Sequence, residues 1–194
     1  MQKIGITGGI GSGKSVVAHI LSCMGIPVYI ADHAAKQLIN SSNQIKTSLI
    51  AHFGEALYTP KGIDKQLLAS LIFSNKQHLL TVNQIVHPIV ATDFQAWAKQ
   101  QNTDFCAMES AILFESGFNS LVDHTLLVYT PQEIRIQRAM KRDETSRQSI
   151  EARIQNQQPD EQKIKLANAI IYNDNQHALI PQVEKLIALL SQSK

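Results

Sequence analysis

The stretch KIGITGGIGSGKSVVAHI, residues 3–20, decides the fold of this chain. A short apolar strand pattern at residues 4–7 leads into GGIGSGKS at residues 8–15, and an apolar helical pattern follows. Residues 8–15 fit G-x-x-x-x-G-K-[ST], the phosphate-binding P-loop motif. Glycine is needed there because the backbone visits positive φ while successive N–H groups turn toward one anion. The helix behind the loop adds unpaired N–H groups and its positive dipole end, so the stretch predicts a nucleotide-phosphate site.

The motif also predicts which groups hold the nucleotide. Lys14 is expected to reach the β- and γ-phosphates, and Ser15 to offer its hydroxyl to Mg²⁺. The loop reads phosphates and not the base, so it does not by itself choose ATP over GTP. The residues expected to bind the nucleotide in and beside the loop are Gly8, Gly9, Ile10, Gly11, Ser12, Gly13, Lys14, Ser15 and Val16.

Composition restricts the class of protein. The chain has 194 residues and is 44% hydrophobic, which suits one compact α/β domain with a small insert or lid. A net charge of +2 gives little support for a nucleic-acid or membrane-surface partner. No apolar run approaches ~18 residues, and the N-terminus opens directly on a strand, so we expect neither a membrane span nor a signal peptide. Cys23 and Cys106 lie in apolar stretches and are expected to be reduced core residues of a cytoplasmic protein.

Further strand patterns alternate with helical ones and predict a parallel sheet. They cover residues 27–30, 105–108, 125–129 and 169–172, and the last helical pattern covers residues 176–190. The alternation lapses between about residues 41 and 102, where helical patterns at 45–53, 65–73 and 77–99 predict a mostly helical insert. The last of these contains His87-Pro88, and a proline there is expected to kink or restart the helix. His87 is either a ligand contact or a polar residue at the kink.

Two carboxylates stand at strand ends. Asp32 follows the strand pattern at 27–30, on the edge where open α/β sheets bind ligands, and it is either a site residue or an N-cap. Glu109 ends the next strand pattern, where P-loop proteins commonly keep an acidic residue that holds Mg²⁺ through water. The charged stretch that begins near Arg142 is either a solvated helical face or a mobile segment whose arginines stabilise a transferring phosphoryl group.

Taken together, these landmarks resemble the dephospho-coenzyme A kinase family over nearly the whole chain. ITGGIGSGKS is similar to the family's P-loop, Asp32 matches the second aspartate of its Asp-Ala-Asp motif, and residues 112–115 are similar to its Leu-Leu-Phe-Glu segment. His87-Pro88 matches its His-Pro pair. Arg138, Arg142-Asp143, Arg153 and Gln157 fit the two ends of its lid, and Asn173 fits an asparagine near the adenine.

The resemblance implies a three-layer P-loop fold with a helical substrate-binding insert and a lid. We expect a single domain over residues 1–194, with a nucleotide-binding core at about 1–40, 103–142 and 159–194, the insert at about 41–102 and the lid at about 143–158. The implied roles are Asp32 as catalytic base, Lys14 and Arg142 on the phosphates, and Ser15 with Glu109 at Mg²⁺. Residues implied to contact the acceptor are Asp32, Lys65, His87, Pro88, Phe114 and Glu115.

The chain departs from the family pattern at four positions. Ile30 stands where the first aspartate is usual, Val16 replaces a threonine, Ala111 a proline and Asn168 an aspartate. None of these removes the P-loop lysine, its hydroxyl neighbour or Asp32, so an active enzyme is expected.

The function implied is ATP-dependent phosphorylation of the ribose 3′-hydroxyl of dephospho-CoA, with Mg²⁺, in a monomer or small homo-oligomer. Another small-molecule P-loop kinase, for nucleoside monophosphates or shikimate, stays open as an alternative. A nucleotide-dependent switch is the alternative from a different class. The chain has no Asn-Lys-x-Asp stretch to read guanine, which disfavours a GTPase switch.

Overall fold

The computed structural model describes residues 1–192, without the side chains of residues 73 and 74. The chain divides into two compact units. The first joins Met1–Ile30 to the chain from Gln100 onward, and the second is Ala31–Lys99. The second unit therefore starts at Ala31, whereas the insert was expected to start near residue 41, because the helix after the second strand packs with the insert helices.

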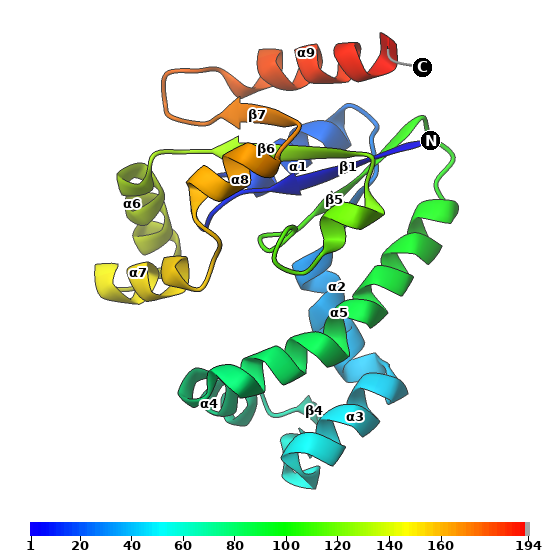
Figure 1. The fold of residues 1–194 in the computed structure, drawn as a ribbon, viewed down its shortest axis with the longest axis vertical. Helices are drawn as coiled ribbons and strands as arrows, with labels where there is room; N and C mark the ends of the chain where they lie inside the picture. Colours follow the sequence, from blue (N-terminus) through cyan, green and yellow to red (C-terminus); the bar gives the residue numbers. More distant parts are fainter. Residues whose placement is uncertain (193–194) are drawn as a thin grey trace. The chain divides into compact units, whose positions relative to one another are not determined.

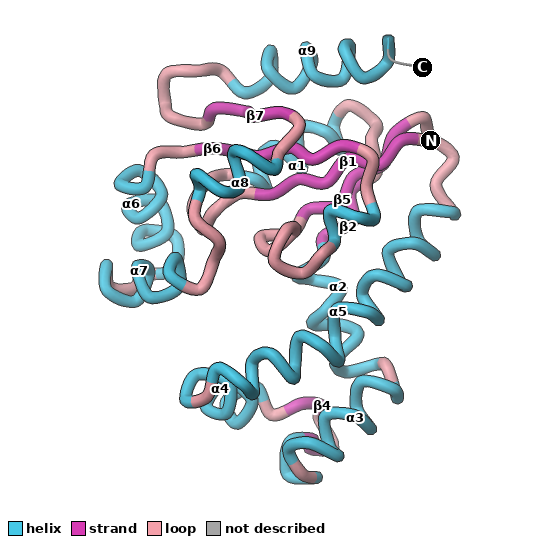
Figure 2. Tube along the Cα trace, viewed as in Figure 1, coloured by secondary structure: helices cyan, strands magenta, loops and turns pink. Residues whose placement is uncertain are grey.

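The first unit is built on a five-stranded parallel sheet with the order β2-β5-β1-β6-β7 (Figures 1 and 2). Its central strands are buried almost throughout, as expected of a parallel sheet covered on both faces. The strand patterns are confirmed to within one residue at each end, except that β1 begins two residues before the predicted start at residue 4. The strands are β1 (Gln2–Thr7), β2 (Val28–Ile30), β5 (Phe105–Glu109), β6 (His124–Tyr129) and β7 (Ala169–Tyr172).

Helices pack the faces of this sheet. In α1 (Lys14–Cys23) and α9 (Leu179–Gln192), Val17, Leu21 and Val183 are fully buried in one core cluster with Ile4 and Leu126. The apolar face of the last helix thus covers the core, and the helix begins at Leu179 rather than 176. The remaining helices are the 3₁₀ turn η2 (Phe118–Leu121), α6 (Gln132–Asp143), α7 (Arg147–Gln155) and α8 (Asp160–Leu166).

The second unit is mostly helical, as predicted. Its helices are α2 (Ala31–Ser41), α3 (Asn43–Phe53), the 3₁₀ turn η1 (Glu55–Leu57), α4 (Lys65–Ser74) and α5 (Lys76–Lys99). A small antiparallel hairpin of β3 (Tyr58–Thr59) and β4 (Gly62–Ile63) lies between η1 and α4 and was not predicted. Strands of two residues are too short to show a period in the sequence.

Helix α5 runs through Pro88 as a single element. Figure 1 shows it changing direction partway along its length. A proline inside a helix removes one intrahelical hydrogen bond and crowds the preceding turn, so it bends the helix. Of the two expected outcomes the structure has the kink and not the restart.

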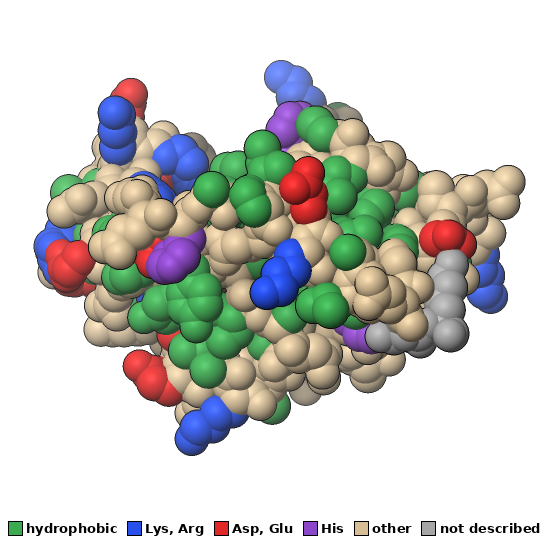
Figure 3. All heavy atoms as spheres, turned by 90° about the horizontal axis from the view of Figure 1, so that it is seen from above, with side chains coloured by type: hydrophobic (Ala, Val, Ile, Leu, Met, Phe, Trp, Pro, Cys, Tyr) green, Lys and Arg blue, Asp and Glu red, His purple; other side chains and the backbone are tan. Residues whose placement is uncertain are grey.

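Two sequence expectations concern the surface. Cys106 is buried, but Cys23 is exposed at the end of α1, so the prediction that both are core residues is wrong for Cys23. Its helix turns that position toward solvent. Within residues 1–192 no helix is long and apolar enough to cross a bilayer. On the face in Figure 3, basic and acidic side chains are interspersed, in keeping with the small net charge of +2.

Candidate nucleotide-phosphate site

The P-loop, residues 8–15, joins the end of β1 to the start of α1 as the sequence predicts. Gly11 and Gly13 have φ of 77° and 87°, a region that residues with a Cβ rarely adopt. Space is short as well. A Cβ on Gly11 would collide with the Arg135 carbonyl group, and one on Gly13 would collide with the Asn173 side-chain amide. Both glycines are therefore required by conformation and by close packing.

The loop presents a set of unpaired backbone donors. Val16 N–H donates to the Gly13 carbonyl and Ser12 N–H to the Gly9 carbonyl. Ile10 N–H donates to Gln157, and the other six N–H groups of residues 8–15 have no protein acceptor among residues 1–192, namely those of Gly8, Gly9, Gly11, Gly13, Lys14 and Ser15. Buried or half-buried N–H groups are nearly always paired, so a cluster of unpaired ones at a helix N-terminus marks an anion site.

Lys14, Ser15 and Glu109 meet at the mouth of this loop. The Lys14 ammonium lies 3.7 Å from the Glu109 carboxylate, and the Ser15 hydroxyl lies 3.5 Å from the same oxygen. Glu109 is the last residue of β5 and only 5% exposed. A hydroxyl and a carboxylate side by side fit Mg²⁺, which prefers oxygen ligands and retains several waters. The structure thus brings together the two residues expected at the metal.

The base of the loop is fastened to the end of β7. Asn173 donates through Nδ2 to the Ser12 carbonyl oxygen at 2.8 Å. The Thr130 hydroxyl lies 2.9 Å from the carbonyl oxygens of both Ser12 and Asn173, and its single proton can serve one of them at a time. Asn173 was expected near the adenine, and Arg138 contacts its carbonyl oxygen at 3.1 Å. Thr130 was missed because a lone threonine after a strand carries no sequence signal.

The ion pair of Arg135 with Asp160 packs against the P-loop. Arg135 is 3% exposed, and its guanidinium leaves no room for a Cβ on Gly9. The guanidinium pairs with Asp160 at 2.7 Å. Burial raises the pKa of the Asp160 carboxyl, with Arg135 opposing that shift. Arg135 was not predicted as a site residue, because it lies in a charged helix where the sequence alone indicates solvent-exposed arginines.

Two arginines of the segment expected to form a lid are held by one acidic partner, Asp143. Arg142 makes two hydrogen bonds to Asp143, at 2.7 and 3.0 Å, and Arg153 reaches the same carboxylate at 2.6 Å. These bonds hold the pKa of the Asp143 carboxyl well below its ordinary value. Two lid arginines thus share one counter-ion in this structure.

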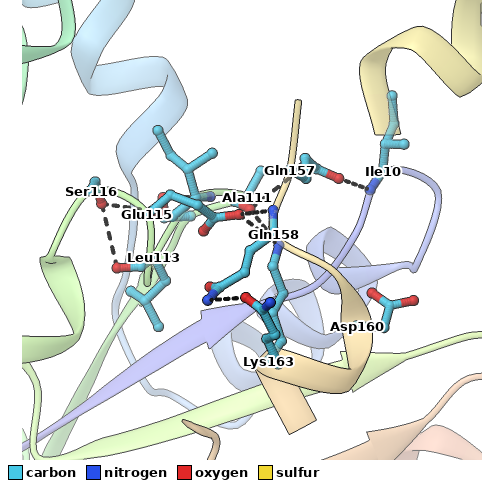
Figure 4. Close-up of polar contacts among 12 residues, drawn as sticks. Ile10, Ala111, Leu113, Glu115, Ser116, Gln157, Gln158, Asp160 and Lys163 are labelled. Atoms are coloured by element: carbon cyan, nitrogen blue, oxygen red, sulfur yellow. Dashed lines mark hydrogen bonds and ion pairs between the residues drawn. The ribbon is translucent and has the colours of Figure 1, made fainter. Parts of the chain in front are cut away.

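The segment after β5 contains two residues expected to contact the acceptor. Phe114 is half-buried there. The Glu115 carboxylate lies 3.0 Å from the ammonium of Lys163 and also accepts the Gln158 N–H at 2.8 Å (Figure 4). Glu115 is thereby engaged in joining this segment to α8.

Four predicted residues belong to the second unit. Asp32 is exposed in the first turn of α2, one residue past its start, and caps no helix N–H, which argues against its N-cap reading. Lys65 borders an apolar cavity of about 380 Å³ whose walls include Ile39, Ile63 and Leu68. His87 and Pro88 lie on α5 and do not line that cavity. Burial lowers the pKa of His87, favouring the neutral imidazole.

Two departures from the family pattern have a local account. Asn168 Oδ1 accepts hydrogen bonds from the backbone N–H and the hydroxyl of Thr125, each at 2.8 Å. A carboxylate oxygen accepts equally well, so either residue can join the start of β6 to the approach of β7. Ile30 is the partly exposed last residue of β2 and pairs in register with Glu109.

Comparison with known proteins decides the family. The family model described as dephospho-CoA kinase matches residues 2–178. The chain belongs to the dephospho-CoA kinase family. The dephospho-CoA kinase of Bacteroides fragilis strain YCH46 is 45% identical over 191 residues, covering 98% of this chain and 93% of that protein. That of Porphyromonas gingivalis is 44% identical over 188 residues, covering 96% and 93%. The prediction of a kinase of this family is confirmed.

Solved structures agree with this assignment. Dephospho-CoA kinase from Campylobacter jejuni has a TM-score of 0.71 at 27% identity, with 98% of each chain covered. The Thermus thermophilus protein TT1252 has a TM-score of 0.82 at 33% identity, covering 100% of this chain and 98% of that one. A shikimate kinase from Acinetobacter baumannii, with a TM-score of 0.58 at 16% identity, shares the fold. The predicted P-loop kinase fold is confirmed.

Proposed function

We propose that this chain transfers the γ-phosphoryl group of MgATP to the ribose 3′-hydroxyl of dephospho-CoA and releases CoA and ADP. The observation that supports the phosphoryl-transfer half is the set of unpaired N–H groups in the P-loop, together with the side chains of Lys14 and Ser15. The acceptor follows from the family. Phosphoryl transfer is catalysed mainly by positioning the reactants and neutralising charge, so the residues of this site act by holding groups in place or by carrying charge.

Nucleotide phosphates bind in the P-loop. The unpaired N–H groups and the helix dipole of α1 hold the α- and β-phosphates, and Lys14 counters charge on the β- and γ-phosphates. The nearby Glu109 carboxylate keeps the Lys14 ammonium at the mouth of the loop. Asn173 and Arg138 are assigned to the adenine side, with support from the bond of Asn173 to the Ser12 carbonyl oxygen and that of Arg138 to the Asn173 carbonyl oxygen.

The Ser15 hydroxyl and, through water, the Glu109 carboxylate would hold Mg²⁺. The support is the 3.5 Å distance between these two groups at the P-loop. The ion would supply positive charge that neutralises the phosphates. Glu109 is buried, so its negative charge needs a positive partner. Without the metal ion, the Lys14 ammonium is that partner.

Asp32 accepts the proton of the acceptor hydroxyl or orients that hydroxyl toward the γ-phosphate. It follows the end of β2, and its carboxylate is exposed and makes no hydrogen bond within residues 1–192. A carboxylate without a structural partner is available for substrate, whereas an N-cap aspartate would be bound to its own helix.

The lid carries the arginines that neutralise the transferring phosphoryl group, with Arg142 as the residue that reaches the phosphates. Arg142 and Arg153 are both bound to Asp143, which keeps their two positive charges together. Closure of this lid excludes water, which otherwise competes with the acceptor for the phosphoryl group.

The acceptor binds to the helical unit. Its cavity of about 380 Å³ has mostly apolar walls and includes Lys36 and Lys65 among its lining residues. This combination suits a ligand with an apolar arm and a diphosphate. His87, whose pKa burial lowers, contributes a hydrogen-bonding group to this unit.

A coupled ADP-release assay with MgATP tests the function. The acceptors compared are dephospho-CoA, AMP, shikimate and none. We expect ADP release only with dephospho-CoA, together with a product that carries one added phosphate. Release with AMP or shikimate identifies another metabolite kinase, and equal release without acceptor identifies a hydrolytic switch.

A further inference from the structure

Ile10, in the middle of the P-loop, is attached to the lid in two ways. Its backbone N–H donates to the side-chain oxygen Oε1 of Gln157 at 2.9 Å. Its side chain is 8% exposed and packs in a cluster with Ile136 of α6 and the fully buried Ile150 of α7. Gln157 lies two residues after the end of α7, where the lid returns to the core. One loop residue therefore contacts both the lid helix and the lid exit.

The lid exit, residues 156–159, is itself anchored on its other side. Gln157 donates through Nε2 to the Ala111 carbonyl oxygen at 3.4 Å, and the Gln158 N–H donates to Glu115. Lys163, fully buried, reaches both Glu115 and the Ala111 carbonyl oxygen. Figure 4 shows Gln157 between Ile10 on one side and Ala111 on the other.

Packing alone does not hold the lid exit. A cavity of about 330 Å³ borders it, lined in part by Arg135, Gln157, Gln158 and Asp160. A segment beside such a space has few neighbouring atoms on that side, so its position depends on directed hydrogen bonds. The side chain of Gln157 makes two of them, one to each neighbouring segment.

We propose that Gln157 is a positioning residue that holds the P-loop in its phosphate-binding shape and couples that shape to the lid exit. This rests on the proposed binding of nucleotide phosphates by the loop. With Ile10 held from outside, the loop is organised before the nucleotide arrives, and less binding free energy is spent on ordering it. Coupling is reciprocal, so nucleotide bound in the loop also slows opening of the lid exit.

The test compares Gln157→Met with Gln158→Met in the full chain. Methionine keeps the length of the side chain and removes both hydrogen bonds of Gln157. Gln158 is the neighbouring glutamine, and its side-chain amide bonds only Gln162 within residues 1–192. The readouts are the Kd of MgADP by calorimetry, KM for ATP and for dephospho-CoA, and the melting temperature.

For Gln157→Met we expect the Kd of MgADP and the KM for ATP to rise about tenfold, because a change of that size corresponds to the loss of one hydrogen bond. The KM for dephospho-CoA stays within twofold, and Gln158→Met matches wild type in every readout. A change in melting temperature with an unchanged Kd of MgADP makes Gln157 merely structural and overturns the proposal. If the wild-type protein itself fails to bind MgADP, the proposed function is overturned as well. Failure of the proposed function is thereby distinguished from failure of the role assigned to Gln157.

Hydrogen exchange on the wild-type chain tests the coupling without any variant. Amides of residues 155–159 are expected to exchange more slowly when MgADP is bound. Exchange there that is the same with and without bound MgADP overturns the proposal, whether or not Gln157→Met folds.

Discussion

The carboxylate of Glu115 lies 3.0 Å from the ammonium of Lys163, whose side chain is completely buried. The resemblance to the family implied a substrate contact for Glu115. In the structure this carboxylate is the charged partner of a buried amine and also binds the Gln158 N–H. Removing Glu115 is costly because the buried Lys163 charge is left with neither its partner nor solvent.

We therefore predict that Glu115→Ala lowers the free energy of unfolding by about 3–5 kcal/mol. The double variant Glu115→Ala with Lys163→Met is expected to recover part of that loss, because no buried charge is left behind. Urea unfolding measures both, and Glu184→Ala, which removes an exposed carboxylate on α9, is the matched control. A raised KM for dephospho-CoA with unchanged stability would instead make Glu115 a substrate contact.

Asp32 is expected to act on the acceptor and not on the nucleotide. Asp32→Asn keeps the size of the side chain and removes its basicity, so turnover should fall about 10²-fold or more. The Kd of MgADP should stay close to the wild-type value. His33→Gln, at the exposed neighbouring position of α2, serves as the control in the same steady-state assay. Wild-type turnover in Asp32→Asn would remove Asp32 from the mechanism.

Alanine substitutions at Gly11 and Gly117 distinguish the cost of backbone strain from the cost of a steric clash. Their φ values are 77° and 75°, so alanine at either position pays about 1–2 kcal/mol of conformational strain. A Cβ at Gly117 meets nothing within 4 Å, whereas at Gly11 it collides with the Arg135 carbonyl group. We expect Gly11→Ala to be the less stable variant and to lose MgADP binding.

Gly117→Ala should bind MgADP normally. Thermal unfolding and calorimetry on the two variants check both statements. Equal stability and equal MgADP affinity would show that the close approach of Arg135 to Gly11 has no energetic consequence.

His87 predicts a pH dependence of stability. Burial lowers its pKa in the folded state, so the unfolded state binds the proton more readily. Stability is therefore greatest above the unfolded pKa of about 6.5 and falls as the pH drops through that value toward the folded pKa. Urea unfolding between about pH 7.5 and 5.5 should show a shallower decline for His87→Gln than for wild type. Parallel curves for the two proteins would contradict this.

Local pattern was sufficient for most of the fold. The P-loop spacing, the apolar strands and the helical insert were readable because each depends on residues close together in the chain. The errors lie where distant segments decide. Cys23 has apolar neighbours in sequence but faces solvent, and Ala31 begins a helix that packs with the insert instead of the core.

In the candidate site too, some residues could be predicted from local sequence and others could not. Lys14 and Ser15 were predicted from the P-loop spacing, and Glu109 from the acidic residue that P-loop proteins commonly keep at the end of that strand. Thr130, Arg135 and the bond from Gln157 to Ile10 were not predicted as a group. Each is an ordinary polar residue whose partner lies at a distant position in the chain, and a partner of that kind leaves no periodic or spacing signal.

The sequence by itself determined the phosphate loop, the parallel sheet behind it and the family, because glycines at fixed spacing and apolar periodicity follow directly from backbone geometry. Only the tertiary structure decided what surrounds the loop. It placed Arg135 beneath the glycines, attached Asn173 to the Ser12 carbonyl and engaged Glu115 with a buried lysine. The reason is physical: burial and hydrogen-bond partners are properties of the packed chain, and no residue carries them alone.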